Sequence, residues 1–404
     1  MSHANSREKW IVIAAALLAV VVAFFLVEGR GTTHPEFGRI YQTNYEQKAK
    51  GETKKPAREH AGGLTYIPEK LPEVPWSIHV VKIDRSRHDL QFETTLGGGN
   101  RLGMSIVSEQ VTSFPTNAGR PLAAVNGDFF KNHEKYPGDP EGLQIIRGEV
   151  VSAPSPKNSF FWVDTEGNPR ITIVQSSFTV TLPGGGVLPL GLNEERMADG
   201  LVLYTAANGN STRTEGGMEV VLTRDAKTNW LPIRIGQTYE ATVREVRNGG
   251  DTTLSRDTMV LSAGTKVSAR LAGLKAGDMV KISTRTTPDL TGCQTAIGGG
   301  PAMVHNGKST NFKGLLPRAP RTALGWNKQY FYLVEVDGRQ RTSAGMTGSE
   351  LTTYMINLGC DEALNLDGGG SATLWVYGQT MNSPSEGHER PAANALLVVR
   401  KEAN

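Results

Sequence analysis

The sequence predicts an α+β fold with a twisted, mixed β-sheet core, few helices, a β-rich inserted region and one N-terminal transmembrane helix. Short strand-like runs recur from Trp76 onward, and turn residues such as Asn-Gly and Gly-Asp separate them. A segment near residue 350 has helical periodicity, and residues 10–27 carry no charge. These three observations place a mainly β domain behind an apolar N-terminal segment.

The composition is that of an ordinary globular protein. The 404 residues are 38% hydrophobic and 21% charged, which excludes a disordered chain. Because 43 basic residues nearly balance 40 acidic ones, the net charge of +3 gives no reason to expect a nucleic-acid partner. The 46 glycines are more than usual and predict many tight turns and close backbone approaches.

Residues 10–27, WIVIAAALLAVVVAFFLV, are long enough to cross a bilayer. As a helix the segment spans about 27 Å, against about 30 Å for the hydrocarbon core. No clean A-x-A site follows, so an uncleaved membrane anchor is favoured over a cleaved signal peptide, which stays open. Arg7 and Lys9 precede the segment, which places residues 1–9 in the cytoplasm. Residues 28–73 are then a flexible spacer, and residues 74–400 an extracytoplasmic domain, secreted if the segment is cleaved.

The predicted domain begins with two strands, Trp76–Asp84 and Leu90–Leu96. A short helix is expected at Ser105–Phe114, and Pro121–Phe130 is expected to be a strand that runs into a polar loop. Residues 158–288 contain many short alternating segments and are predicted to form the β-rich inserted region.

A helix is best marked just before the end of the chain. Thr347 and Glu350 fit a capping box. Apolar residues follow at helical spacing, and Gly359 is expected to end the helix. The next strand is predicted at residues 363–366 and delivers Asp367.

Two predicted strands end in the same pattern, an asparagine and an aspartate two residues apart. Asn126 and Asp128 follow one apolar run, and Asn365 and Asp367 follow the other. Residues i and i+2 share a strand face, so each strand points an amide and a carboxylate the same way. In sheets with crossover helices this end of a strand is where ligands bind. The alternative is that Asn-Gly and Asp-Gly simply form turns.

Two glycine triplets accompany these strands, Gly298–Gly300 and Gly368–Gly370. Consecutive glycines can expose backbone N–H groups to an anion or a sugar oxygen. The alternative is close packing of the two loops on each other. Ser371 is not a nucleophile elbow, because Thr373 replaces the last glycine of G-x-S-x-G.

Arginines near the same segments could bind a phosphate. Arg318 and Arg321 flank Pro320 before a strand-like run and could form a phosphate clamp. Arg390 and Asn394 lie just before the terminal strand.

The chain has two cysteines, Cys293 and Cys360, and no CxxC or HExxH motif, so a zinc site of the usual sequence pattern is not expected. An extracytoplasmic location permits a Cys293–Cys360 disulfide. Two separate buried thiols are the alternative.

Several of these segments occur in an order that resembles a known family. The segments are AAVNGDFF, IGGGPAMV, PRTALGW, VDGR, GMTGSEL, ALNLDGGGSATLWV and ERPAANALLV. Together they resemble the phosphodiester glycosidase family, whose namesake is N-acetylglucosamine-1-phosphodiester α-N-acetylglucosaminidase and whose bacterial members include exopolysaccharide-associated proteins. The resemblance covers roughly Trp76 to Val399, and NLDGGGS is its most specific element.

The resemblance implies a hydrolase that cleaves a sugar phosphodiester at the anomeric carbon. Asp128, Asp367 and Arg321 are then the expected catalytic residues. The expected substrate-binding residues are Asn126, Gly299, Gly300, Asn365, Gly368, Gly369, Ser371, Thr373, Arg390 and Asn394. The expected substrate is a sugar phosphate or polysaccharide of the envelope or exopolysaccharide.

Two other functions stay open at this point. One is a membrane-anchored, non-catalytic factor for polysaccharide binding or assembly. The other is a metal-dependent phosphodiesterase, in which Asp128 and Asp367 would bind a divalent cation. No cofactor is certain from the sequence, and a divalent cation is left open.

Overall fold

The computed structural model describes residues 58–60, 63–132, 135–224, 230–312 and 314–401. The predicted cytoplasmic tail, the apolar segment at residues 10–27 and most of the predicted spacer lie outside these residues. Within the described ranges, no helix is both long and apolar enough to cross a membrane.

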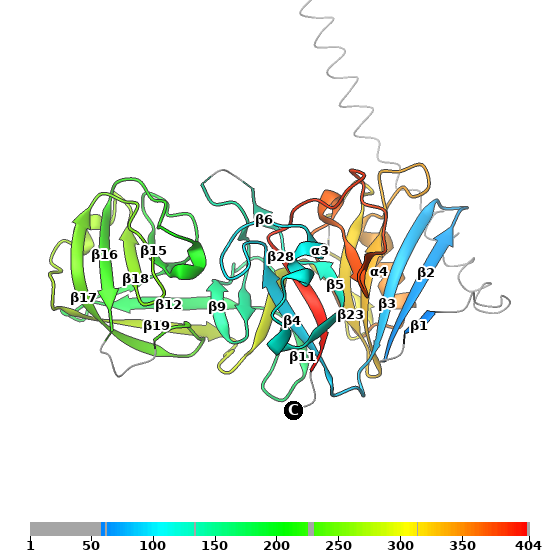
Figure 1. The fold of residues 1–404 in the computed structure, drawn as a ribbon, viewed down its shortest axis with the longest axis horizontal. Helices are drawn as coiled ribbons and strands as arrows, with labels where there is room; N and C mark the ends of the chain where they lie inside the picture. Colours follow the sequence, from blue (N-terminus) through cyan, green and yellow to red (C-terminus); the bar gives the residue numbers. More distant parts are fainter. Residues whose placement is uncertain (1–57, 61–62, 133–134, 225–229, 313, 402–404) are drawn as a thin grey trace, which may run out of the picture. The chain divides into compact units, whose positions relative to one another are not determined.

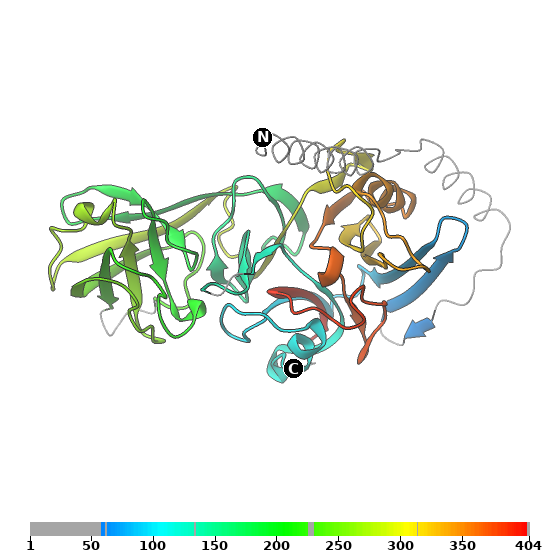
Figure 2. The ribbon, with the colours of Figure 1, turned by 90° about the horizontal axis from the view of Figure 1, so that it is seen from above.

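The first large sheet has eight strands, and every pair in it is antiparallel. Its strands, in spatial order, are β1 (Arg58–His60), β2 (Leu64–Leu71), β3 (Trp76–Asp84), β24 (Tyr330–Val336), β23 (Arg321–Trp326), β25 (Glu362–Asn365), β21 (Ala302–His305) and β22 (Lys308–Ser309). We call it the main sheet (Figures 1 and 2).

The predicted spacer is too long at its C-terminal end. Residues 64–71 are strand β2, which pairs along its length with β3 and buries Leu64, Tyr66 and Leu71. The folded part therefore begins before residue 74, because Leu64 and Tyr66 are buried on one face of this strand and Leu71 is buried at its end.

A second, five-stranded antiparallel sheet packs on the main sheet. Its order is β27 (Gln379–Thr380), β26 (Leu374–Val376), β5 (Arg120–Asn126), β28 (Asn394–Arg400) and β4 (Leu90–Leu96). Leu396 and Val398 of β28 face a core shared with Leu333 and Leu364 of the main sheet. The intervening residues of β28 face the other way, onto helix α3 (Val107–Thr112). The period of two along β28 thus separates the inner core from the helix-covered outer face.

Helix α4 (Gly348–Asn357) lies on the opposite face of the main sheet. Its Thr347–Glu350 capping box forms as predicted, and Gly359 follows its end with a φ of +82°. Met355 of α4 packs where Gly325 of β23 has no side chain, since a Cβ there would lie 2.6 Å from the Met355 methyl. The other helices of the described residues are short 3₁₀ turns at Thr116–Ala118, Ala206–Asn208, Ser268–Arg270 and Gly369–Ser371.

Two further sheets complete the inner region. A five-stranded sheet has the order β11 (Pro169–Ile173), β10 (Ser159–Val163), β20 (Thr295–Gly299), β8 (Gln144–Ile146) and β9 (Glu149–Ser152). A two-stranded sheet pairs β6 (Phe130–Lys131) with β7 (Asp139–Pro140). Phe161 and Ile297 of this five-stranded sheet pack into the core between the main sheet and the second sheet.

The predicted inserted region forms an eight-stranded sheet whose core also includes Ile145 and Phe160 of the five-stranded sheet. The order is β13 (Val187–Pro189), β12 (Gln175–Thr181), β19 (Met279–Thr287), β17 (Thr238–Asn248), β16 (Met218–Thr223), β18 (Met259–Ala263), β15 (Leu201–Tyr204) and β14 (Gly191–Leu192). Figure 1 shows β15, β16, β17 and β18 grouped together in green. Residues 159–173 pair elsewhere, so this sheet starts later than the predicted boundary at residue 158.

The structure confirms a mostly β chain with twisted sheets and few helices. The predicted mixed core is wrong, because the strand pairs of the core sheets are antiparallel and the parallel pair β14–β15 belongs to the inserted region. Helix α4 connects β24 to β25 across β23, and α3 connects β4 to β5 across β28. Because the strand between each pair is antiparallel to both, these crossover connections produce no parallel neighbours.

The cysteines are two buried free thiols, so the disulfide prediction is wrong. Cys293 precedes β20 and Cys360 precedes β25, and these two strands meet only at their C-terminal ends. Cys293 lies before β20, where its thiol donates to the Thr295 carbonyl at 3.3 Å, and Cys360 packs behind Gly325 in the main sheet. Burial raises the pKa of the Cys293 thiol to about 11 and that of Cys360 to about 12.

We expect two free thiols per chain when the unreduced protein is unfolded in the presence of a thiol reagent. The folded protein should react far more slowly, because both thiols are buried and their raised pKa values suppress the thiolate. Titration with a chromogenic disulfide reagent, with and without denaturant, measures both quantities. A chain without titratable thiol under denaturing conditions would contradict the structure.

Candidate active site

The ends of β5 and β25 meet, although the two strands belong to different sheets. The Asp367 backbone N–H donates to the Gly127 carbonyl at 2.9 Å. The Asn126 side-chain amide donates to the Asp367 carbonyl at 2.7 Å. Both predicted asparagine-aspartate pairs therefore lie at one place.

Asp128 is held in a buried pocket with almost no space around its carboxylate. A Cβ on Gly298 would lie 1.9 Å from Oδ2 of Asp128, and one on Gly142 would lie 3.0 Å from the same oxygen. The Asp128 backbone N–H donates to Oδ1 of Asn394 at 2.8 Å, and the Asn394 amide donates to Gln144 at 2.8 Å. Asn394 thus positions Asp128, and Gln144 positions Asn394.

Asp128 retains its proton more readily than an ordinary aspartate. Burial raises the pKa of Asp128 well above the usual value, because the residue is only 2% exposed and its charged form loses its hydration. The backbone N–H groups of Phe129 and Gly142 oppose this shift, while the carboxylates of Glu141 and Asp367 add to it. The contribution of Asp367 to this raised pKa is the smallest of these and agrees with the meeting of the two strand ends.

Asp367 is more accessible and better compensated. Its side chain is 16% exposed, and its Oδ2 lies 3.7 Å from a guanidinium nitrogen of Arg390. The Gly368 N–H donates to Oδ1 at 2.8 Å. Burial raises the Asp367 pKa, but the Ser371 hydroxyl, the Gly368 N–H and the Arg390 charge all act to lower it. Of the two carboxyls, Asp367 is thus the one that can reach a ligand as an anion.

The glycine triplets bring the two loops close together. The Gly300 N–H donates to the Asn365 carbonyl at 2.8 Å, and a Cβ on Gly299 would lie 2.7 Å from that oxygen. The Gly369 N–H donates to Pro320 at 2.9 Å, with a φ of +60° that favours glycine. Close packing, the second alternative, therefore explains much of both triplets, because these N–H groups bind within the protein.

Two of the predicted phosphate-binding arginines have other partners. Arg321 donates from Nε to the Met346 carbonyl and from one terminal nitrogen to the Leu315 and Pro317 carbonyls, each at 2.8 Å. Arg318 forms a two-pronged ion pair with the capping-box residue Glu350. Arg321 thus stabilises the adjoining loop, and Arg318 stabilises the first turn of α4. These contacts do not support a phosphate site formed by these two residues.

Arg390 and Arg339 are better placed to meet an anion. Arg390 is 40% exposed and donates to the Ser371 hydroxyl at 2.5 Å, beside Asp367. The exposed Arg339 has a terminal nitrogen 3.1 Å from the position that a Cβ on Gly369 would occupy. The two guanidinium groups therefore border the Gly368–Gly370 triplet.

The other predicted residues form hydrogen bonds with one another and with the backbone of the site. The Asn365 amide donates to the Gly300 carbonyl at 2.8 Å, and the Thr373 N–H donates to Oδ1 of Asn126 at 3.1 Å. Asn365, Ser371 and Thr373 are all buried.

Sequence reasoning missed Arg339, Glu141, Gly142 and Gln144. Arg339 stands in the quoted VDGR segment and could have been found there. The other three lie in a loop and a short strand without a periodic signal.

A cavity adjoins this arrangement. It has a volume of about 310 Å³ and is lined by Phe129, Lys157, Asn158, Gly300, Pro301, Phe312, Gly314 and Leu315. Phe129 follows Asp128 in the chain, and Gly300 ends the first triplet, so segments of the site contribute to the lining, although neither Asp128 nor Asp367 lines the cavity. Its two phenylalanines and one lysine could contact a sugar face and an anionic group.

Comparison with known proteins supports the resemblance seen in the sequence. Residues 233–399 match the family model described as phosphodiester glycosidase. This range includes Asp367 and Arg390 but begins after Asp128. Over 90 residues, or 22% of this chain, the sequence is 33% identical to the SPbeta prophage-derived uncharacterized protein YomE of Bacillus subtilis (strain 168), and the match covers 14% of that protein.

Two solved structures share the fold. A hypothetical protein from Synechocystis matches 84% of this chain and 62% of its own, with a TM-score of 0.67 and 19% identity. A "Putative exported protein" from Burkholderia pseudomallei K96243 matches 80% of this chain and 74% of its own, with a TM-score of 0.63 and 22% identity. This chain therefore spans less than two thirds of the Synechocystis protein and a small part of the Bacillus protein.

We expect Gly298→Ala to destabilise the protein by about 1–3 kcal/mol, because the added methyl group must displace the Asp128 carboxylate. The matched control is Gly184→Ala, in a loop where an added Cβ meets nothing within 4 Å. Its effect should stay within about 0.5 kcal/mol. Denaturant unfolding of both variants measures the difference, and equal stabilities would show that the contact between Asp128 and Gly298 is not tight.

We expect Asp128→Asn to remove a pH-dependent cost of folding. The folded-state pKa of Asp128 lies above the unfolded value, so between the two the folded protein binds the extra proton. Its contribution to the free energy of unfolding therefore falls as pH rises from about 4 through the folded pKa. Asparagine mimics the neutral acid and does not titrate.

The variant should thus match the wild type near pH 4 and exceed it in stability at pH 8. Unfolding curves at several pH values, subtracted pairwise, isolate this residue from the other carboxyl groups. A variant less stable than the wild type at pH 8 would show that Asp128 is charged in the folded state.

Proposed function

We propose that this chain, whose residues 233–399 match the phosphodiester glycosidase family, hydrolyses the bond between the anomeric carbon of a sugar and a phosphodiester. The observation that carries the proposal is the meeting of Asp367, Asp128 and Arg390 at the joined ends of β5 and β25. It supplies two carboxyl groups of unequal proton affinity and a cation beside the more accessible one.

The charges fit the departure of a phosphodiester. Such a leaving group is a weak base and needs little protonation, so stabilising its negative charge matters more. Arg390 lies beside Asp367, and Arg339 lies over Gly369, on the same border of the site. Two guanidinium groups can hold phosphate oxygens with charge-assisted hydrogen bonds.

The two carboxyls suit different tasks. Asp367 is partly exposed and compensated by Arg390, so it acts on the anomeric carbon, as the nucleophile or by removing a proton from the attacking water. Asp128 is buried and its pKa is raised, so in this proposal it stays neutral and leaves the negative charge on Asp367. Two carboxyl groups are the usual minimum for glycoside hydrolysis.

The cavity lined by Phe129 and Gly300 supports a sugar as the reacting group. Phe129 and Phe312 offer apolar surface of the kind that packs on a sugar ring, and Lys157 adds a positive charge. We propose that the substrate is a sugar-1-phosphodiester unit within a polymer of the envelope or of an exopolysaccharide. Such a polymer contains many of these units.

The test is the identity of the products. The full chain is incubated with a panel of sugar-1-phosphodiesters, and free sugar and phosphorylated aglycone are measured by chromatography and phosphorus NMR. The proposal expects free reducing sugar with the phosphate left on the aglycone. Phosphate left on the sugar would instead identify a phosphodiesterase, and binding without turnover would identify a polysaccharide-binding factor.

We expect Asp367→Asn to lower kcat by at least 10²-fold while leaving the melting temperature nearly unchanged. The substitution keeps the shape of the side chain and removes the charge next to Arg390. Asp361→Asn is the matched control, since Asp361 is exposed and lies just before the same strand. Initial rates of sugar release and a melting curve are measured for each variant, and near-wild-type turnover by Asp367→Asn would leave Asp367 as a turn residue only.

A further inference from the structure

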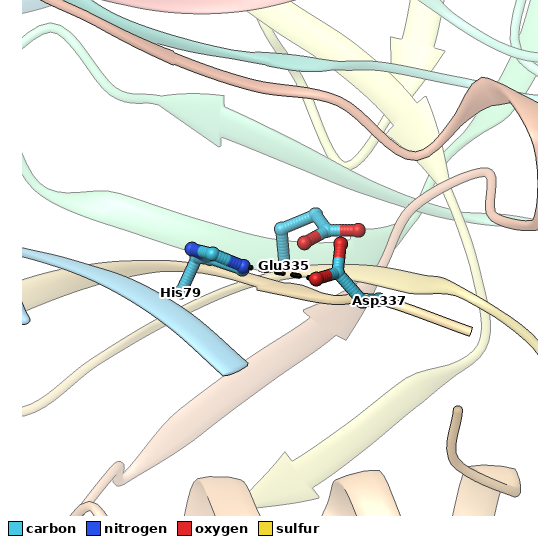
Figure 3. Close-up of side chains that lie close together, drawn as sticks. All are labelled: His79, Glu335 and Asp337. Atoms are coloured by element: carbon cyan, nitrogen blue, oxygen red, sulfur yellow. Dashed lines mark hydrogen bonds and ion pairs between the residues drawn. The ribbon is translucent and has the colours of Figure 1, made fainter. Parts of the chain in front are cut away.

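A second group of polar side chains lies inside the main sheet, on strands β3 and β24. His79 of β3 pairs directly with Glu335 of β24, and the Asp337 N–H donates to the Ser77 carbonyl at 3.0 Å. Because paired residues and residues two apart share a face, His79, Glu335 and Asp337 all point the same way. Figure 3 shows the imidazole and the two carboxylates directed toward one another.

These three side chains are almost completely buried. Glu335 is 0% exposed, Asp337 4% and His79 8%. One ligand atom from each lies within 4.8 Å of the others. His79 Nε2 contacts Oδ2 of Asp337 at 3.2 Å, and its Nδ1 contacts the Tyr66 hydroxyl at 2.7 Å, which fixes the orientation of the ring.

Glu335 is the member of this group whose burial needs an explanation. Neither of its carboxylate oxygens has a hydrogen-bond partner of good geometry, although the Asn382 amide is near enough to lower its pKa slightly. Burial first, and then the charge of Asp337, raise the Glu335 pKa well above the usual value. An unpaired buried carboxylate is costly, so such a group normally carries a proton or binds a cation.

We propose that His79, Glu335 and Asp337 bind one divalent transition-metal cation, for which Zn²⁺ is the best match. An imidazole nitrogen with two carboxylate oxygens is a ligand set that Zn²⁺ accepts, and three protein ligands leave one position for a hydroxyl or water. The Ser77 hydroxyl, 3.4 Å from His79 Nε2, lies near that position. The Tyr66 contact at Nδ1 leaves Nε2 as the ligand atom and supports the imidazole from behind.

The ion has a structural role in this arrangement. Glu335 pairs across the sheet with Thr322 of β23, and the Thr322 hydroxyl donates to Asn126 at 2.8 Å. Asn126 in turn holds the Asp367 carbonyl. The ion would therefore stabilise the strands that hold Asn126 and Asp367, without touching a substrate. The inference does not depend on the reaction proposed above.

The first test uses the purified full chain and needs no variant. The protein is dialysed against a strong chelator, then against buffer, and its metal content and melting temperature are measured before and after addition of Zn²⁺. We expect about one zinc per chain after reloading and a rise in melting temperature of roughly 5 °C. Co²⁺ added in place of Zn²⁺ should give visible absorption bands typical of a low-coordinate nitrogen and oxygen site.

Two variants locate the ion. Glu335→Gln keeps the size of the side chain and should lose at least tenfold in zinc affinity. Glu93→Gln is the matched control, because Glu93 is another buried carboxylate with a raised pKa but belongs to β4 in the second sheet. It should retain full zinc binding.

The outcomes separate cleanly. A wild-type chain that takes up no zinc or cobalt and whose melting temperature does not respond to metal overturns the proposal. So does undiminished zinc binding by Glu335→Gln. If Glu335→Gln does not fold, the stoichiometry and Co²⁺ spectrum of the wild type still decide, and an absent spectrum means that protons rather than a metal ion neutralise the cluster.

Discussion

The side chain of Asn126 holds together the part of the structure on which the site depends. Its amide donates to the Asp367 carbonyl, and its oxygen accepts from the Thr322 hydroxyl and the Thr373 N–H. Asn126 is the last residue of β5, so these three bonds join the second sheet to the main sheet and to the loop after β25. The bonds from Thr322 and Thr373 are buried, and the bond to Asp367 is partly buried. Leaving a buried partner unsatisfied would cost about 1–3 kcal/mol. The two aspartates can lie close together because this residue fixes the ends of their strands.

Close backbone approach is the second requirement of the site, and glycine supplies it. Gly298 leaves the space that the Asp128 carboxylate occupies, and Gly299 leaves the space for the Asn365 carbonyl. Neither position tolerates a Cβ without movement of its neighbour. The triplets therefore determine how near the two loops lie, and the N–H groups that bind inside the protein keep them there.

How much of this could be predicted from sequence depends on the range of the signal. The capping box of α4 was predicted because its residues are three apart in the chain and their preference is local. The position of each asparagine-aspartate pair at the end of a strand was also predicted, since it is a local pattern. That the two strand ends meet depends on the stacking of two antiparallel sheets, which no local pattern reveals.

Long-range register explains most of what was missed. The cluster of His79, Glu335 and Asp337 depends on the pairing of β3 with β24, and no pattern within either segment reveals that His79 lies opposite Glu335. The sequence predicted Arg321 as a catalytic residue from a segment that resembles the family, and that role stays a prediction. Its hydrogen bonds to the Met346, Leu315 and Pro317 carbonyls become visible only once the loop has folded around it.

The buried carboxyls of this core illustrate how one fold keeps acidic groups in different charge states. Asp367 lies near the surface, where Arg390 and the Gly368 N–H offset its charge, so it can remain an anion and act on a ligand. Asp128 is almost completely buried, and burial first, with the charges of Glu141 and Asp367 after it, raises its pKa well above the usual value, which favours the neutral acid. Glu335 is deeper still and shares its site with Asp337 and an imidazole, a combination that a bound cation would neutralise. Burial, rather than residue type, thus decides which carboxyl is available for chemistry, and the strand that carries Thr322 connects all three environments.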